Sequence, residues 1–186
     1  MTDQFLEAYR WIAAQPVDWR AVFVTSHYAG LALALSLALL GDSLGIRVLL
    51  TPGPKPSRRL IRRIHAGVIV GLVVIWGSGF GMILQKFALD QIPNKLVFKL
   101  AVATILSLNA LMVRTLLMPL AQRVRRPLAP RLNLVEAIGV ALVGSVSLSS
   151  WLALATIAFV KPVQELPLTT LFTGYGAAVG GLAAIC

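Results

Sequence analysis

Charged side chains are scarce in this sequence: they make up 13% of its 186 residues, whereas 58% are hydrophobic. A soluble domain carries about 25% charged residues. Half of that share is too little to keep a surface of this size in water, which excludes an ordinary soluble domain. The length fits one membrane domain and leaves no room for a second globular unit.

Residues that bind metals or act as nucleophiles are also few. Cys186 is the one cysteine, so no disulfide and no cysteine-based metal cluster can form within the chain. His27 and His65 are the only histidines. The sequence contains no Gly-x-Ser-x-Gly, His-Glu-x-x-His or phosphate-loop motif. We therefore expect no enzyme.

Long apolar segments fill most of the chain. About 20 apolar residues cross the roughly 30 Å of hydrocarbon in a bilayer. The segments are continuous and lack the alternation of barrel strands, which favours helices. The sequence predicts an all-α integral membrane bundle over residues 21–186, with five transmembrane helices at 21–41 (or on to 50), 65–85, 97–119, 137–160 and 167–186.

Residues 1–20 precede the first span and have a different pattern. Their apolar residues recur at helical spacing, with charged residues between them, which predicts a short amphipathic helix at the outer interface. No cleavable signal peptide is expected, because the segment is polar and contains acids. The apolar positions are Phe5, Leu6, Tyr9, Ile12 and Ala13, and Trp11 and Trp19 suit the headgroup region.

Lysine and arginine are concentrated in every second connection, and the formal net charge is +10. The richer connections hold Arg47, Lys55, Arg58, Arg59, Arg62 and Arg63, and then Arg123, Arg125, Arg126 and Arg131. Cytoplasmic loops are enriched in these residues, so we expect a bacterial inner-membrane protein with a periplasmic N-terminus and a cytoplasmic C-terminus. The lipid bilayer is the expected partner of the basic residues. Nucleic acid is not, because the basic runs lack interleaved aromatic residues.

Glycine pairs at four-residue spacing predict close contacts between helices. They are Gly67 and Gly71, Gly77 and Gly81, and Gly176 and Gly180. The sequence favours packing within the bundle, and a face for a second copy or another subunit is the alternative.

Three ionisable residues fall toward the predicted cytoplasmic side of their helices: Asp42, His65 and Arg114. Ionisable groups inside a bilayer are costly and mark functional sites by default. A buried carboxylate requires a cationic partner. We predict a salt bridge between Asp42 and Arg114 or a polar cluster that includes His65, and a bridge that only fixes helix register is the alternative.

His27 is the candidate ligand for a metal or a haem, with Lys99 and Asn109 as supporting outer polar residues. A haem held by two histidines needs both at one depth. His27 and His65 each lie near the start of antiparallel helices, about 20 Å apart along the membrane normal. A b-type haem would therefore share ligands between chains. Copper(I) prefers sulfur ligands, but methionine in apolar helices usually fills space.

Two segments resemble known membrane proteins. Trp11, His27 with Gly30, and Gly41-Asp42 before Gly45 resemble a group of small uncharacterised bacterial inner-membrane proteins. The segment from Lys99 through Leu108-Asn109 to Pro119 resembles a span of the CopD-type copper-resistance membrane proteins. The resemblance implies an inner-membrane protein whose outer-facing His27 meets a metal ion or a haem edge. The chain departs from the CopD type in having fewer helices, histidines and methionines.

Three hypotheses for function follow. The sequence favours a non-enzymatic accessory or structural subunit that packs against a larger membrane complex and holds no cofactor. A CopD-like protein that handles or transports copper through His27 is the second hypothesis. A b-type haem electron carrier with ligands shared between chains is the third.

Overall fold

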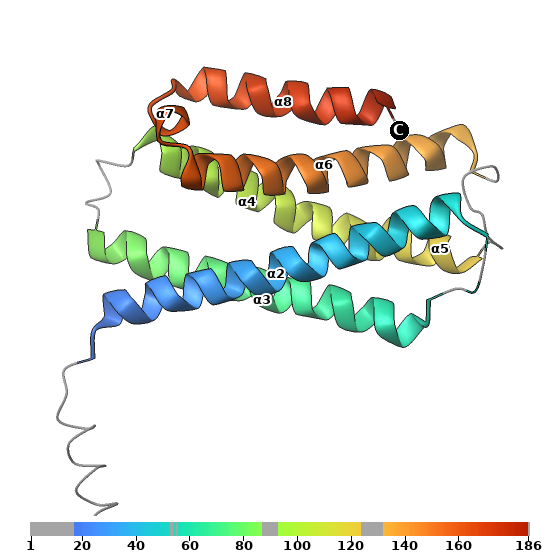
Figure 1. The fold of residues 1–186 in the computed structure, drawn as a ribbon, viewed down its shortest axis with the longest axis horizontal. Helices are drawn as coiled ribbons and strands as arrows, with labels where there is room; N and C mark the ends of the chain where they lie inside the picture. The colour runs from blue at the N-terminus through green and yellow to red at the C-terminus, as the bar shows by residue number, and fades with distance from the viewer. Residues whose placement is uncertain (1–16, 53, 55, 87–92, 124–131, 186) are drawn as a thin grey trace, which may run out of the picture.

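The computed structural model describes residues 17–52, 54, 56–86, 93–123 and 132–185, with all their side chains except those of 121–123. These residues form helices and connections and contain no strand. The helices are α2 (Trp19–Leu50), α3 (Arg58–Lys86), α4 (Asn94–Met112), the π-helical segment η1 (Val113–Leu117), α5 (Met118–Arg123), α6 (Leu134–Phe159), α7 (Lys161–Gln164) and α8 (Leu168–Ile185) (Figure 1).

The predicted all-α membrane bundle is confirmed. Five helical segments in the described part of the chain are long and apolar enough to cross a membrane: Trp19–Leu50, Arg58–Gln85, Asn94–Leu120, Leu134–Phe159 and Leu168–Ile185. The predicted interfacial helix falls on residues 1–20, of which 1–16 lie outside the described residues.

One helix takes the longer of its two predicted ends, and another begins before the apolar segment that predicted it. The first runs without a break through Gly41 to Leu50, and the second begins at Arg58, seven residues before His65. Hydropathy marks where lipid ends, but a helix continues in water until its backbone is interrupted. Here Pro52, Pro54 and Pro56 interrupt the backbone between the two helices.

The third spanning segment contains a π-helical turn and does not end at Pro119. The N–H of Met118 donates to the carbonyl of Val113, a bond one residue longer than in an α-helix, and the chain continues as α5 to Arg123. Pro119 has no N–H, and its ring crowds the carbonyl four residues earlier. A wider turn directly before the proline relieves that crowding and keeps the segment helical.

The two helices α2 and α3 form an antiparallel pair joined through small residues. A Cβ added at Gly71 would lie 2.7 Å from Cβ of Ala34 and 2.9 Å from the carbonyl oxygen of Gly30. Gly67 lies against Leu37, and Gly81 lies against the ring of Phe23. The predicted packing role of these three glycines therefore agrees with the structure. The partner positions Gly30, Ala34 and Ala38 are buried and follow the same four-residue spacing.

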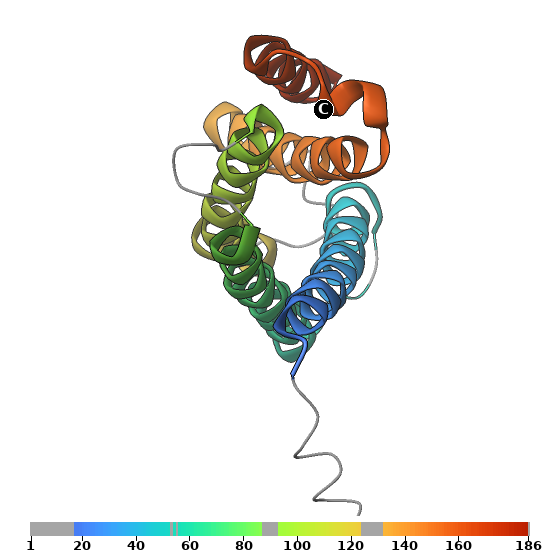
Figure 2. The ribbon, with the colours of Figure 1, turned by 90° about the vertical axis from the view of Figure 1, so that its left-hand side faces the viewer.

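Three other predicted packing glycines have no such contact. A Cβ added at Gly77, Gly176 or Gly180 would meet nothing within 4 Å. Gly176 and Gly180 belong to α8, which lies on the far side of α6 from α2 and α3 (Figure 2). Their expected role within the bundle is not met, because α8 turns another face toward its neighbours.

The remaining helices form a second group, in which α6 packs between α4 and α8. Phe98 of α4 contacts Phe172 and Tyr175 of α8 edge-on, with ring centroids 5.1 Å and 6.4 Å apart. The Tyr175 hydroxyl shares a 2.9 Å hydrogen bond with Ser150 of α6. This aromatic cluster lies where α4 and α8 begin, the same end at which α2 begins (Figure 1). We call this the His27 end and the opposite one the Asp42 end.

Candidate functional site

A cavity of about 640 Å³ lies between the α2/α3 pair and the second group of helices, toward the Asp42 end. Segments α2, α3, α4, η1, α5, α6 and α8 all contribute to its wall. The wall is mostly aliphatic. Its polar members are Asp42, Ser43, His65, Asn109, Ser145, Ser147 and Trp151, and no Lys or Arg of the described residues lines it.

Among the described residues, Asp42 is the one that brings a carboxylate to the lining. Its Oδ2 accepts a 3.1 Å hydrogen bond from the hydroxyl of Ser147, which links α2 to α6. This serine replaces the partner that the sequence predicted: Arg114 lies on η1, is exposed and does not line the cavity. The predicted salt bridge is therefore wrong. Hydropathy places both residues at one depth, but the direction of each side chain around its helix separates them.

His65 shares the cavity with Asp42, so the structure brings together two of the three residues in the predicted cluster. Their helices touch at the preceding positions, where a Cβ on Gly41 would lie 3.5 Å from Cγ2 of Ile64. The Nε2 atom of His65 is buried and has no hydrogen-bond partner in the protein. Arg114 remains close enough to His65 for their charges to interact.

Trp151 forms part of the wall on α6 and is 4% exposed. Its indole N–H is buried and has no partner in the protein. A buried donor or acceptor without a partner costs about 1–3 kcal/mol. Trp151 and His65, which each carry such an atom, line the same cavity. The polar wall is thus incompletely satisfied by the chain itself.

The cavity lies at membrane depth. Asp42 and His65 are each about 11 Å from the midpoints of their helices at 1.5 Å per residue. The hydrocarbon core extends about 15 Å on either side of the bilayer centre. With the midpoints of α2 and α3 placed at the bilayer centre, both side chains fall within the apolar layer, where an ionisable group is a candidate functional residue.

Asn109 lines this cavity. The sequence had suggested that it supports His27 at the opposite end. It is buried, and its Nδ2 donates a 3.1 Å hydrogen bond to the carbonyl of Val143 on α6. The bond holds α4 against α6 beside the cavity. Asn109 is thus a structural link in the cavity wall.

His27 lies at the other end of the same helix pair. Its Nδ1 is 3.1 Å from the hydroxyl of Ser78 on α3, and Lys99 of α4 is close enough for the two charges to interact. Ser78 is 13 residues from His65 on α3. The partner of His27 is therefore about 20 Å from His65 along the helix. In the described part of the chain no three His, Cys, Asp or Glu side chains gather into a metal-binding group. The structure gives His27 a serine and a lysine as neighbours.

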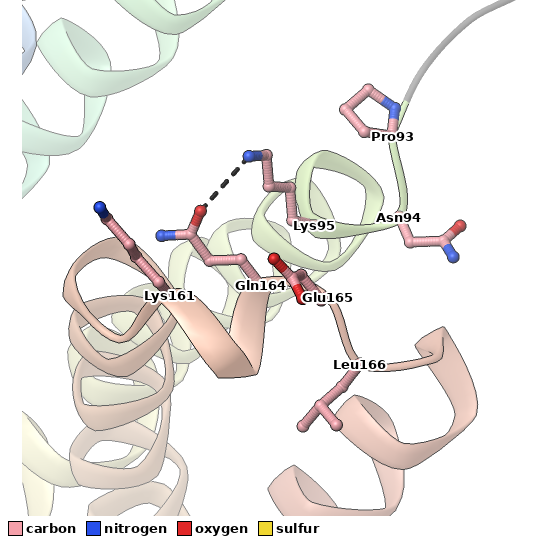
Figure 3. Close-up of a pocket in the computed structure, with 7 residues that line it drawn as sticks. All are labelled: Pro93, Asn94, Lys95, Lys161, Gln164, Glu165 and Leu166. Carbon is pink, nitrogen blue, oxygen red and sulfur yellow. Dashed lines mark hydrogen bonds between the residues drawn. The ribbon is translucent and has the colours of Figure 1, made fainter.

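A shallower pocket of about 460 Å³ lies at the His27 end, between the start of α4 and the turn formed by α7 (Figure 3). Lys95 donates a 3.3 Å hydrogen bond to the side-chain oxygen of Gln164 across this pocket. Lys161 and Glu165 also line it. The charges are of both signs and mostly exposed, as expected at a headgroup layer.

Sequence reasoning identified Asp42 and His65 but missed two residues of the cavity. Trp151 and Ser147 carry no formal charge, and they lie in an apolar segment where hydropathy gives no warning. A usable signal was the run of serines on α6, because Ser145, Ser147, Ser149 and Ser150 are all buried in the structure.

Comparison with known proteins finds no family model, no curated protein and no solved structure that matches the chain significantly. The function must therefore be inferred from the membrane-spanning architecture and the cavity at the Asp42 end.

Proposed function

We propose that this multi-pass membrane protein binds a small lipophilic molecule in the cavity at the Asp42 end. The observation that carries the proposal is the largely aliphatic cavity of about 640 Å³, whose lining includes His65 and Trp151, two residues with a buried and unpartnered ring nitrogen. Ligand pockets combine an apolar lining with a few polar groups in this way, at volumes of about 300–1,000 Å³.

A hydrocarbon chain alone would not complete this site. It would fill the aliphatic part of the cavity, but it offers no hydrogen bond to Trp151 or His65. A ligand with an apolar body and at least one polar group would satisfy both parts. Such a molecule can enter from the bilayer, where lipophilic compounds concentrate.

The binding test uses N-phenyl-1-naphthylamine, an uncharged fluorescent probe, with the protein in lipid nanodiscs. Replacing Trp11, Trp19 and Trp76 by Phe leaves Trp151 as the energy donor to the bound probe. The amount of probe dissolved in the lipid increases linearly with the probe concentration. An energy-transfer signal that saturates therefore reports binding in the cavity. Empty nanodiscs supply the background.

Two glycines of α6 provide a matched pair for this test. A Cβ at Gly144 or at Gly139 would meet nothing within 4 Å, but only Gly144 lines the cavity. We expect Gly144→Phe to fill the cavity and abolish saturable binding, and Gly139→Phe to retain it. Equal binding by both variants, or a signal that never saturates in the parent protein, would refute the proposed function.

A role as an accessory subunit is a second candidate, favoured by the exposed glycines of α8. Gly174, Gly176, Gly180 and Gly181 have open space where a side chain would stand, which allows another helix to approach closely. Native gel electrophoresis of mild-detergent extracts tests this role. A stoichiometric complex in the parent protein that is lost in Gly176→Leu would support it, and the monomer alone in both would contradict it.

We further propose that the protein resides in a bacterial inner membrane with the Asp42 end toward the cytoplasm. Arginines support this orientation, because Arg47, Arg58, Arg59, Arg62 and Arg63 are all exposed at that end. The cavity would then lie in the cytoplasmic half of the bilayer.

A further inference from the structure

We propose that the ligand of the cavity is a lipophilic cation, held with Asp42 as its counter-ion. This inference rests on the proposed function and adds the charge of the ligand to it. It follows from the placement of formal charges around the cavity, which is strongly one-sided.

Asp42 is the only acid on the wall, and no Lys or Arg of the described chain balances it there. The bundle offers cations nearby, but they do not line the cavity: Arg114 is exposed on η1, and Arg47 is exposed in the last turn of α2. A carboxylate in a low-dielectric cavity attracts a positive charge strongly, because little solvent screens it. An amine, ammonium or phosphonium group supplies that charge.

The hydrogen bonding of Asp42 leaves room for such a partner. Ser147 donates to Oδ2 only, and an ionised carboxylate can accept about four hydrogen bonds. A basic residue at position 147 would neutralise the charge of Asp42 within the protein. The observed neutral donor links the carboxylate of α2 to α6, and no cationic side chain of the described residues lines the cavity beside it.

Trp151 supplies the second element of cation recognition. Trp151 is one of the residues that line the same cavity, and it is 4% exposed. Aromatic faces attract cations, most strongly when water is excluded. The aliphatic remainder of the wall accommodates an apolar body. The carboxylate, the tryptophan and the aliphatic lining together match a monovalent lipophilic cation better than a neutral lipid or an anion.

The test is displacement of N-phenyl-1-naphthylamine from the Trp151-only protein by three phenyl-substituted compounds of different charge. Tetraphenylphosphonium is the cation, triphenylphosphine oxide the neutral compound and tetraphenylborate the anion. We expect the cation to displace the probe at the lowest concentration, at least about tenfold below the neutral compound, a difference that a single charge contact can supply. The anion should not displace it.

Asp42→Asn keeps the shape of the side chain and removes its charge. We expect this variant to bind the uncharged probe as before and to lose about tenfold or more in affinity for the cation. Glu165→Gln, at the His27 end and outside the cavity, is the control and should leave cation affinity unchanged. Retained probe binding shows that Asp42→Asn is folded. If it loses probe binding, Asp42→Glu, which keeps the charge, must retain cation displacement for the inference to hold.

The outcomes separate the two proposals. If the uncharged probe binds but the cation has no advantage, or Asp42→Asn retains the advantage, the counter-ion inference is refuted and the binding function stands. If the probe shows no saturable binding in the parent protein, the proposed function fails and this inference fails with it.

Discussion

Single side chains decide how closely the helices of this bundle approach. At Gly71 the neighbouring atoms belong to the backbone and Cβ of α2, so no flexible side chain can move aside. At Gly176 an added Cβ would face open space. Two glycines that look alike in the sequence therefore have opposite sensitivity to substitution.

Gly71→Ala is expected to destabilise the protein by about 1–3 kcal/mol, because the added methyl group overpacks the contact with Ala34 and Gly30. Gly176→Ala is the matched control and should be neutral or slightly stabilising, since alanine favours helix by about 1 kcal/mol. Unfolding by a denaturing detergent, followed by circular dichroism in mixed micelles, measures both. Equal stability of the two variants would show that α2 and α3 are not packed through Gly71.

The same residues show how far a sequence leads to a site of this kind. Asp42 and His65 could be identified because an ionisable side chain in an apolar segment is conspicuous. Their partners could not, because hydropathy gives depth along a helix and not direction around it. Ser147 and Arg114 both lie near the depth of Asp42, and only the packing of α2 against α6 selects the serine.

Among the elements, η1 departs most from regular geometry. It spans Val113–Leu117 and contributes Val113 and Leu117 to the wall of the cavity. The sequence predicted that the third span ends at Pro119. The apolar span ends at Leu120, but the helix continues through α5 to Arg123. Within a membrane the backbone cannot leave its polar groups unpaired, so the chain widens one turn and remains helical. The sequence identified the proline but not this response to it.

Pro119→Ala restores an N–H and removes the crowding that favours the π-helical turn. We expect a regular α-helix from α4 into α5, a rotation of Val113 and Leu117 away from the cavity, and about tenfold weaker binding of N-phenyl-1-naphthylamine. Stability should not fall, because an interior proline is itself unfavourable to a helix. The displacement assay and thermal unfolding measure the two effects.

Pro162→Ala is the control for this change, since Pro162 lies in the short helix α7 at the His27 end and outside the cavity. It should leave probe binding as it is in the parent protein. Unaltered binding in Pro119→Ala as well would mean that the π-helical turn does not shape the cavity.

The molecule as a whole consists of a helix pair, α2 and α3, facing a second group built around α6, with the cavity toward one end of the division. The number and placement of spans were predictable because lipid requires long apolar segments. The division was not, since it depends on which faces carry the small residues: Gly30 and Ala34 pack against α3, whereas α8 leaves its glycines outward. The orientation in the membrane stays a prediction of the arginine distribution.

Cysteine labelling tests that orientation in a Cys186→Ser background. Thr51→Cys places a thiol at the Asp42 end and Asn94→Cys places one at the His27 end, and both positions are exposed. With an impermeant maleimide and intact spheroplasts, we expect Asn94→Cys to be labelled directly and Thr51→Cys only after the membrane is permeabilised. The reverse pattern would invert the topology, and labelling of both from outside would contradict five spans.

The close approach of α2 and α3 also determines how the cavity can respond to different occupants. Where two backbones touch through Gly30 and Gly71, the helix pair that carries Asp42 and His65 is stiff. The opposite wall has a widened turn in η1 and free space beside Gly144, so it can yield. Compounds of unequal bulk would then be accepted alike, provided that each presents its polar group at the same point on the rigid side.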